Sequence, residues 1–275
     1  MTRGLDHDVS EGPGDTVLRR RRPGAEGLDA TAEAALLTLV RPLSPIPVFR
    51  VLDVWPAADT LMLEHIPGQP LLPHLGAVRP QQALRLGREL GDLVATLACI
   101  PRAHVEHLVP VDVARPAELI AEATDAWDGI RDAVPPSCRG RVEAFLGAVP
   151  DLPACEPVVC HQDLGAEHIF VDGPLMRITG VIDWSDAALG DPALDLGLVL
   201  RDLGPAAAAR AVGQLEARGI DMTGVTARAL FHARLRALEN LSHGLTTDQD
   251  LYRVNALRAI ERLFHPDAGS RSPAH

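Results

Sequence analysis

Apolar residues in the first part of the chain follow the short periods that are typical of β-strands. Runs that fit strands lie at residues 16–20, 48–54 and 60–65, and Pro and Gly residues separate them. A helical pattern at residues 29–40 lies between the first two runs. We therefore predict a small part that combines strands with one helix and ends near residue 66.

Helical periodicity dominates the rest of the chain. Leu86, Leu90, Leu93 and Leu97 recur at helical spacing behind Pro80, which is a helix start signal. Residues 115–149 and 192–264 are also predicted to be helical, and short strands are predicted at residues 157–160, 169–171 and 179–182.

The segment IPGQPLLP, which is rich in proline, is the natural linker between the two parts. The fold class is therefore α+β. We predict a β-rich N-terminal domain at residues 1–66 and a larger, mostly helical C-terminal domain at residues 67–275.

Composition excludes some functions. The 275 residues carry a formal net charge of −11, and every one of the 26 basic residues is an arginine. An acidic chain disfavours nucleic acid, because phosphate binding needs a basic surface. The sequence has no apolar stretch near the roughly 20 residues of a membrane span and no signal-peptide core. We expect a cytoplasmic protein that binds neither nucleic acid nor membrane, and no obligate protein partner is evident.

Two local features are interpreted as structural. The four cysteines lack paired C-x-x-C spacing, so we expect reduced thiols and no zinc site. The cluster from Arg19 to Arg22 directly follows a strand-like run, and we interpret it as a solvated strand edge.

A polar stretch, HQDLGAEH at residues 161–168, lies between two predicted strands that together form a hairpin-like element. It contains His161, Asp163 and His168, and the next predicted strand ends at Asp183. If the three strands lie together, Asp163, His168 and Asp183 converge. By itself the stretch fits a base beside a metal ligand, a zinc cluster or an ordinary polar loop.

The residue types favour a hard cation over zinc, since two carboxylates and one imidazole converge without a cysteine. Magnesium usually takes one or two protein carboxylates and completes its shell with water and substrate phosphates. Asp163 is then free to act on a substrate. Phosphoryl transfer needs these two separate roles. One carboxylate orients the attacking hydroxyl, while metal ligands hold the ion that neutralises charge on the transferred phosphoryl group.

HQDLGAEH resembles the catalytic loop of the kinase superfamily. GVIDWSDAALGDPALDL, later in the chain, resembles the corresponding segment of the aminoglycoside phosphotransferase family, and the motifs are most similar to those of aminoglycoside 2''-phosphotransferases and macrolide phosphotransferases. The resemblance implies a bilobal, protein-kinase-like fold and a reaction that uses Mg²⁺ with ATP or GTP.

The resemblance also implies roles for individual residues. Asp163 corresponds to the catalytic base, and His168 and Asp183 correspond to the metal ligands. The nucleotide-binding positions are Arg19, Glu33, Glu64 and Ile66, and the residues that support the loop are His161 and Asp195. Glu64 and Ile66 use backbone groups, and Met62 before them is expected to border the base pocket.

The chain departs from the family pattern in two ways. First, His168 stands where kinases have asparagine. Second, the N-terminus is short: GLDHDV resembles the tail of the family's glycine loop and its returning strand, and the strand before that loop is missing, so either the start codon is misassigned or the phosphate lid is incomplete. Arg19 stands where the family has its lysine or arginine, and Glu33 is its expected partner.

The predicted function is a small-molecule kinase that phosphorylates a hydroxyl of an antibiotic-like acceptor, either an aminoglycoside or a macrolide. Candidate acceptor-binding residues are Asp186, Asp191 and Glu239, whose carboxylates suit a cationic acceptor. The alternatives are a kinase for a metabolite alcohol such as choline or homoserine, and a non-catalytic kinase-like binding protein.

Overall fold

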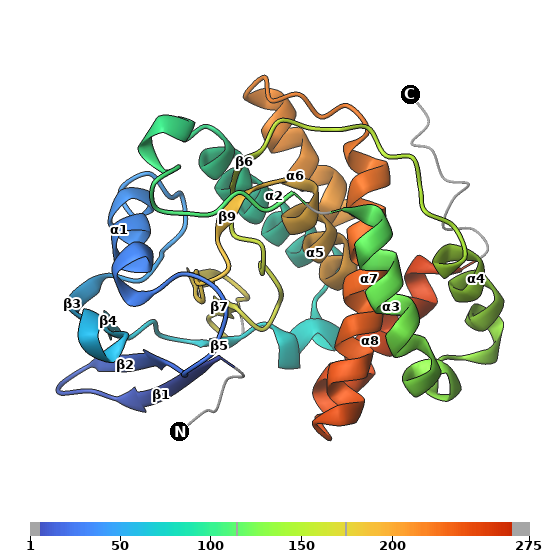
Figure 1. Ribbon diagram of the computed structural model, residues 1–275, viewed down its shortest axis with the longest axis horizontal. Helices are drawn as coiled ribbons and strands as arrows, with labels where there is room; N and C mark the ends of the chain where they lie inside the picture. Colours follow the sequence, from blue (N-terminus) through green and yellow to red (C-terminus); the bar gives the residue numbers. More distant parts are fainter. Residues whose placement is uncertain (1–5, 114, 174, 266–275) are drawn as a thin grey trace.

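A computed structural model describes residues 6–113, 115–173 and 175–265 of the chain (Figure 1). An antiparallel sheet and one helix come first, and helices make up most of the remaining chain. The predicted α+β class, with a small β-rich part and a larger helical part, is confirmed. The domain boundary at residue 66 stays a prediction.

The N-terminal sheet has the strand order β1-β2-β4-β3. Its strands are β1 (His7–Glu11), β2 (Thr16–Arg21), β3 (Val51–Trp55) and β4 (Thr60–Glu64). Helix α1 (Ala30–Val40) packs against β3 and β4. It begins where the Asp29 side chain accepts hydrogen bonds from the backbone N–H groups of Thr31 and Ala32, which have no partner within the helix.

The interpretation of Arg19 to Arg22 as a strand edge is wrong. β2 pairs with β1 on one side and with β4 on the other, so it lies inside the sheet. Successive residues of a strand point to opposite faces. Arg20 is therefore exposed, whereas the Arg19 side chain points inward and is only 7% exposed.

The predicted linker is ordered where it enters the helical part. Gln69 and Pro70 form β5, which pairs with β7 (Ile169–Val171) in a sheet of order β5-β7-β8. Strand β8 (Ile178–Val181) reaches back to the first part, because Val181 donates its backbone N–H to the Pro47 carbonyl at 3.1 Å. These strands therefore join the two parts of the chain.

Helices form most of the rest of the molecule. They are α2 (Pro80–Ala98), α3 (Pro116–Ile130), α4 (Pro136–Leu146), α5 (Ala193–Leu203), α6 (Pro205–Ala217), α7 (Val225–Thr246) and α8 (Asp250–Leu263). Short 3₁₀ turns lie at Pro56–Ala58, Leu72–Ala77, Arg102–His104 and Arg131–Ala133. Helices α2 and α6 pack closely because Gly91 lies against Ala211, where an added Cβ would come 2.4 Å from the Ala211 Cα.

Helix α5 runs through the middle of the helical part, between α6 and α7 (Figure 1). Its residues from Ala193 to Val199 are all buried. The cysteines are free thiols, as expected. Among the described residues, no helix is both long enough and apolar enough to cross a membrane.

Candidate active site

The loop at residues 161–168 does not join two strands of a hairpin. β6 (Val158–Cys160), before it, pairs with β9 (Ala188–Gly190), whereas β7, after it, pairs with β5 and β8. The loop therefore passes from one small sheet to another. Its end is nevertheless tied to the end of β8, because Ile182 donates its backbone N–H to the His168 carbonyl at 2.9 Å. This contact brings His168 beside Asp183, as predicted.

The His168 imidazole lies between two carboxylates. Its Nδ1 is 3.0 Å from the Asp163 carbonyl oxygen and 3.1 Å from Asp163 Oδ2, and its Nε2 is 3.8 Å from Asp183 Oδ2. Burial alone would lower the pKa of His168, but Asp163, Glu167 and Asp183 raise it to about 10. The same contact with His168 outweighs burial and holds the pKa of Asp163 well below its usual range. Asp163 is therefore ionised, as a hydroxyl-orienting base must be.

Asp183 receives a cation from the N-terminal sheet. Its Oδ1 accepts hydrogen bonds from Arg19 Nη1 at 3.1 Å and from Ser185 Oγ at 2.9 Å. Burial opposes the ionised form, but Arg19 and His168 lower the pKa of Asp183 below its ordinary value. The backbone of Asp183 is in the left-handed region, with φ of 60°. Such a conformation costs about 1–3 kcal/mol, and it is often found at functional sites.

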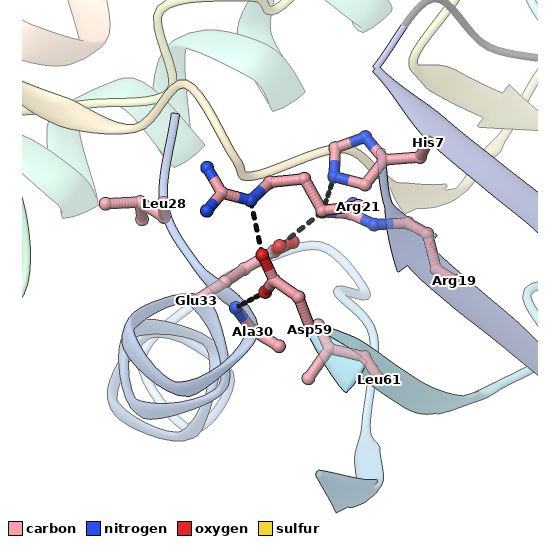
Figure 2. Close-up of a pocket in the computed structure, with 8 residues that line it drawn as sticks. All are labelled: His7, Arg19, Arg21, Leu28, Ala30, Glu33, Asp59 and Leu61. Carbon is pink, nitrogen blue, oxygen red and sulfur yellow. Dashed lines mark hydrogen bonds and ion pairs between the residues drawn. The ribbon is translucent and has the colours of Figure 1, made fainter. Parts of the chain in front are cut away.

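Arg19 connects Asp183 with helix α1. Its Nη2 forms a buried ion pair with Glu33 and lies 3.2 Å from His7 Nε2 (Figure 2). Burial and the nearby Arg19 charge lower the pKa of His7 to about 4, so the ring is neutral and accepts a hydrogen bond from Arg19. Arg19 and Glu33, both predicted to be nucleotide-binding positions, thus contact each other.

A second ion pair holds α1 in position. Arg21 Nε contacts Asp59 Oδ2 at 2.6 Å, and Asp59 Oδ1 accepts the backbone N–H of Ala30, the first residue of α1, at 2.7 Å (Figure 2). This contact holds the first turn of α1, and Glu33 lies in that turn. The position of the Glu33 side chain relative to Arg19 is therefore fixed. Sequence reasoning missed His7, Arg21 and Asp59. Arg21 has one signal in the sequence, the two-residue period of β2, which places Arg19 and Arg21 on the same face of the strand.

The first turn of α5 supports the start of the loop. The buried Asp195 accepts the backbone N–H groups of His161 and Gln162, each at 2.9 Å. The His161 ring is buried, lies 3.1 Å from the Ile182 carbonyl oxygen and packs edge-on against Trp184, with ring centres 4.6 Å apart. His161 and Asp195 therefore lie where loop-supporting residues are expected.

The last turn of α5 holds the other half of the loop. Arg201, whose side chain is 2% exposed, contacts Asp202 at 2.7 Å and Glu167 at 3.2 Å. Asp202 also accepts the backbone N–H of Ala166 at 2.8 Å. Ala166 and Glu167 directly precede His168, so α5 fixes the loop at both of its ends. Sequence reasoning missed this contact, which joins residues far apart in the chain.

Replacing Arg201 by alanine is expected to lower the free energy of unfolding by about 3–5 kcal/mol, because Glu167 and Asp202 become buried charges without a cation. Arg102→Ala is the matched control, since the Arg102–Glu106 pair is exposed and contributes at most about 1 kcal/mol. Urea denaturation of both variants measures the difference. Equal losses in the two variants would show that the Arg201 contacts do not brace the loop.

Comparison with known proteins agrees with this geometry. The model of the phosphotransferase enzyme family matches residues 7–232, a range that contains the N-terminal sheet, the loop, Asp183 and α5. The chain belongs to this family. Its membership confirms the resemblance that the motifs indicated.

Individual relatives share the fold or part of the sequence. Viomycin phosphotransferase from Streptomyces vinaceus is 32% identical over 146 residues, which cover 50% of this chain and 48% of that protein. The match thus spans about half of that relative's length. The GDP and kanamycin complex of APH(2")-IIia has a TM-score of 0.69 at 18% identity and covers 96% of this chain and 91% of its own. Macrolide 2'-phosphotransferase type I has a TM-score of 0.61 at 19% identity and covers 94% of this chain and 88% of its own. The two structures confirm the bilobal, protein-kinase-like fold.

The chain leaves β4 at Glu64 and continues to Ile66. Backbone groups of these two residues are predicted to bind the nucleotide base. Glu64 donates its backbone N–H to the Arg50 carbonyl at 2.9 Å, and the buried Ile66 side chain packs over Gly180. Arg19 pairs directly with Leu61, so Leu61 and Leu63 share the face that carries Arg19. Met62 lies on the opposite face. The expectation that Met62 borders the base pocket stays a prediction, and the strand register makes Leu63, on the Arg19 face, the alternative to test.

The predicted acceptor-binding carboxylates lie in different surroundings. Asp191 contacts Arg228 at 2.6 Å, and it also accepts the backbone N–H of Ala193 at the start of α5. Glu239 pairs with Arg236 on the exposed face of α7. Asp186 is exposed, and partial burial of its carboxyl group together with the Asp163 charge raises its pKa to about 6. Asp186 therefore lies close enough to Asp163 for the two carboxylates to repel each other.

The donor set fits a magnesium ion that keeps most of its water. Among the described residues, no group of three or more His, Cys, Asp or Glu side chains is arranged to hold a metal. Magnesium needs fewer, because water and nucleotide phosphates complete its shell. Asp183 Oδ2 and His168 Nε2 face each other and supply one carboxylate and one imidazole. The imidazole must lose its proton before it can bind a cation.

Proposed function

We propose that this chain transfers the γ-phosphoryl group of ATP or GTP to a hydroxyl of an antibiotic-like acceptor. The observation that carries the proposal is the meeting of Asp163, His168 and Asp183 at one point, with Arg19 reaching Asp183 from the N-terminal sheet. The arrangement combines an ionised base, a candidate cation site and a fixed guanidinium. Phosphoryl transfer uses these components for positioning and for stabilising charge.

Each side chain has one task in this reaction. Asp163 accepts a hydrogen bond from the acceptor hydroxyl and directs its oxygen toward the γ-phosphorus, then takes up the hydroxyl proton. Arg19, held by Glu33 and His7, presents its planar fork to nucleotide phosphates. Backbone groups of Glu64 and Ile66 bind the base. Asp195 and Arg201 keep the loop in the orientation that these tasks need.

His168 and Asp183 are the residues that would hold magnesium. When bound, the ion neutralises charge on the nucleotide phosphates. His168 also contacts Asp163 through its other ring nitrogen, so the base and the cation site share one ring. The orientation of Asp163 is thus linked to the residue that replaces the asparagine of kinases.

Family membership and the relatives named above support an antibiotic acceptor. The acidic chain and the exposed Asp186 suit an acceptor that carries amino groups, such as viomycin or an aminoglycoside. Metabolite alcohols such as choline or homoserine, and macrolides, belong in the same test. The ionised Asp163 and Asp183 favour an enzyme over a kinase-like protein that only binds its ligand.

The proposal is tested by acceptor-dependent production of nucleoside diphosphate. Purified protein with magnesium and either ATP or GTP is incubated with viomycin, aminoglycosides, macrolides, choline and homoserine in turn. We expect at least one antibiotic to raise diphosphate production well above the rate without acceptor. Nucleotide binding without stimulation by any acceptor would favour the non-catalytic alternative, and stimulation by choline or homoserine alone would favour a metabolite kinase.

Leu63→Tyr is expected to weaken nucleotide binding by about tenfold or more, equivalent to about 1.4 kcal/mol. The larger ring would project from the face of β4 that carries Arg19. Met62→Tyr adds a similar ring on the opposite face and should leave the Kd of both nucleotides nearly unchanged. Titration calorimetry with ATP and GTP measures both variants, and circular dichroism checks that each is folded. Equal effects of the two substitutions would contradict the proposal that the Arg19 face of β4 borders the base.

A further inference from the structure

A cavity of about 490 Å³ lies away from the catalytic cluster. It opens between the segment before β3, one face of α2 and the start of β8. Its lining residues are Pro45, Ile46, Pro47, Arg85, Arg88, Glu89, Asp92, Arg177 and Ile178. It shares no lining residue with the site around Asp163, and its volume is in the range of small-molecule sites, about 300–1,000 Å³.

The charges that line the cavity are unbalanced. Arg85 lies 3.7 Å from Glu89, and Arg88 lies 3.5 Å from Asp92, so each of these arginines has one nearby carboxylate. Within the part of the chain that the structure describes, the Arg177 guanidinium makes no ion pair or hydrogen bond. The cavity therefore has one positive charge in excess, although the chain as a whole is acidic.

Arg85 gives the cavity a fixed cationic wall. Its Nη2 donates to the carbonyl oxygens of Leu175 at 2.5 Å and Met176 at 3.0 Å, which anchors the turn before β8 to α2. Its Nε is buried and lies 3.7 Å from Glu89 Oε1, too far for a hydrogen bond, and it has no other hydrogen-bond partner among the described residues. An acceptor oxygen that entered the cavity beside Arg85 would give this buried donor a hydrogen bond.

The opposite wall is apolar. Pro45, Pro47 and Ile178 border the cavity, and Ile46 beside them is buried. A guanidinium fork matches the paired oxygens of a carboxylate or phosphate, whereas the prolines and Ile178 can pack against hydrocarbon. A ligand that carries both features would satisfy both walls.

We propose that this cavity is a second ligand site that binds a small organic anion, with its carboxylate or phosphate among Arg85, Arg88 and Arg177 and its apolar group against Pro45, Pro47 and Ile178. The site lies between segments from both parts of the chain. Its lining does not include Asp163, His168, Asp183 or Arg19. The proposal does not depend on the function proposed above.

Phenyl phosphate and benzoate are the probes, and benzyl alcohol is the neutral comparator. Titration calorimetry is done on the full chain with saturating nucleotide and magnesium, so that the catalytic site is filled. Arg88→Gln/Arg177→Gln is the test variant, and both side chains are exposed, so the fold should be kept. Arg102→Gln, an exposed arginine elsewhere, is the matched control.

We expect a Kd on the order of 1 mM for at least one anion, as befits a ligand of this size. The affinity should fall tenfold or more in the double variant and stay unchanged in Arg102→Gln, and benzyl alcohol should bind more weakly. Three outcomes would overturn the proposal: no binding of either anion, equal binding by the double variant and the control, or binding of the anion only when the nucleotide is omitted. The last would place the anion in the nucleotide site.

Discussion

Asp163→Asn is expected to slow phosphoryl transfer by about 10²–10⁴-fold, because the amide cannot take up the hydroxyl proton. Asparagine has the same shape, and its carbonyl can still accept a hydrogen bond from His168. The fold and the Kd of the nucleotide should therefore change little. Single-turnover transfer with a functional acceptor measures the chemical step apart from product release.

Asp151→Asn is the control for this substitution. Asp151 is exposed and lies outside the site, so its replacement should leave the rate unchanged. If Asp163→Asn transferred phosphate as fast as the wild type, Asp163 would have no part in the chemistry. A large loss of nucleotide affinity in Asp163→Asn would instead assign the residue to binding.

Asp183→Asn is expected to lower magnesium-dependent turnover by about 10²–10³-fold, since one charge-stabilising contact in an active site contributes this much. It also removes the carboxylate that pairs with Arg19. His168→Asn restores the kinase residue and should keep most of the activity. His168→Ala should raise the magnesium concentration that is needed for half-maximal rate and lower the maximal rate. Titration of the rate with magnesium compares the three variants with the wild type.

The result for His168→Ala decides the role of the ring. If this variant followed the wild-type magnesium curve, His168 would only brace Asp163 through its Nδ1 contact, and the metal would depend on Asp183 alone. If Asp183→Asn kept full activity, the candidate cation site itself would be wrong. Circular dichroism of each variant separates loss of function from loss of fold.

Local patterns in the sequence predicted much of this fold. The helix at 29–40 is bounded by Asp29, whose side chain caps it as such residues usually do. The convergence of Asp163, His168 and Asp183 followed from strands that end next to polar residues. The shared face of Leu61 and Leu63 could have been found as well, because these residues alternate with Met62 along one strand.

Other features depend on contacts between distant residues. The pairing of β6 with β9 joins two three-residue strands, and segments this short carry no signal for their partner. Nothing near Arg201 in the sequence indicates Glu167 as its partner, since 34 positions separate them. The burial of Arg19 among four consecutive arginines depends on the position of β2 inside the sheet.

The most direct test of the proposed function traces the γ-phosphoryl group itself. Nucleotide labelled at this phosphate is mixed with excess protein, magnesium and the acceptor that stimulates diphosphate production, and the products are identified by mass spectrometry. We predict that the label appears on a hydroxyl of the acceptor, that removing magnesium abolishes its transfer, and that Asp163→Asn slows it. Label found only in nucleotide or free phosphate, with the nucleotide still bound at full affinity, would contradict a phosphotransferase that acts on this acceptor.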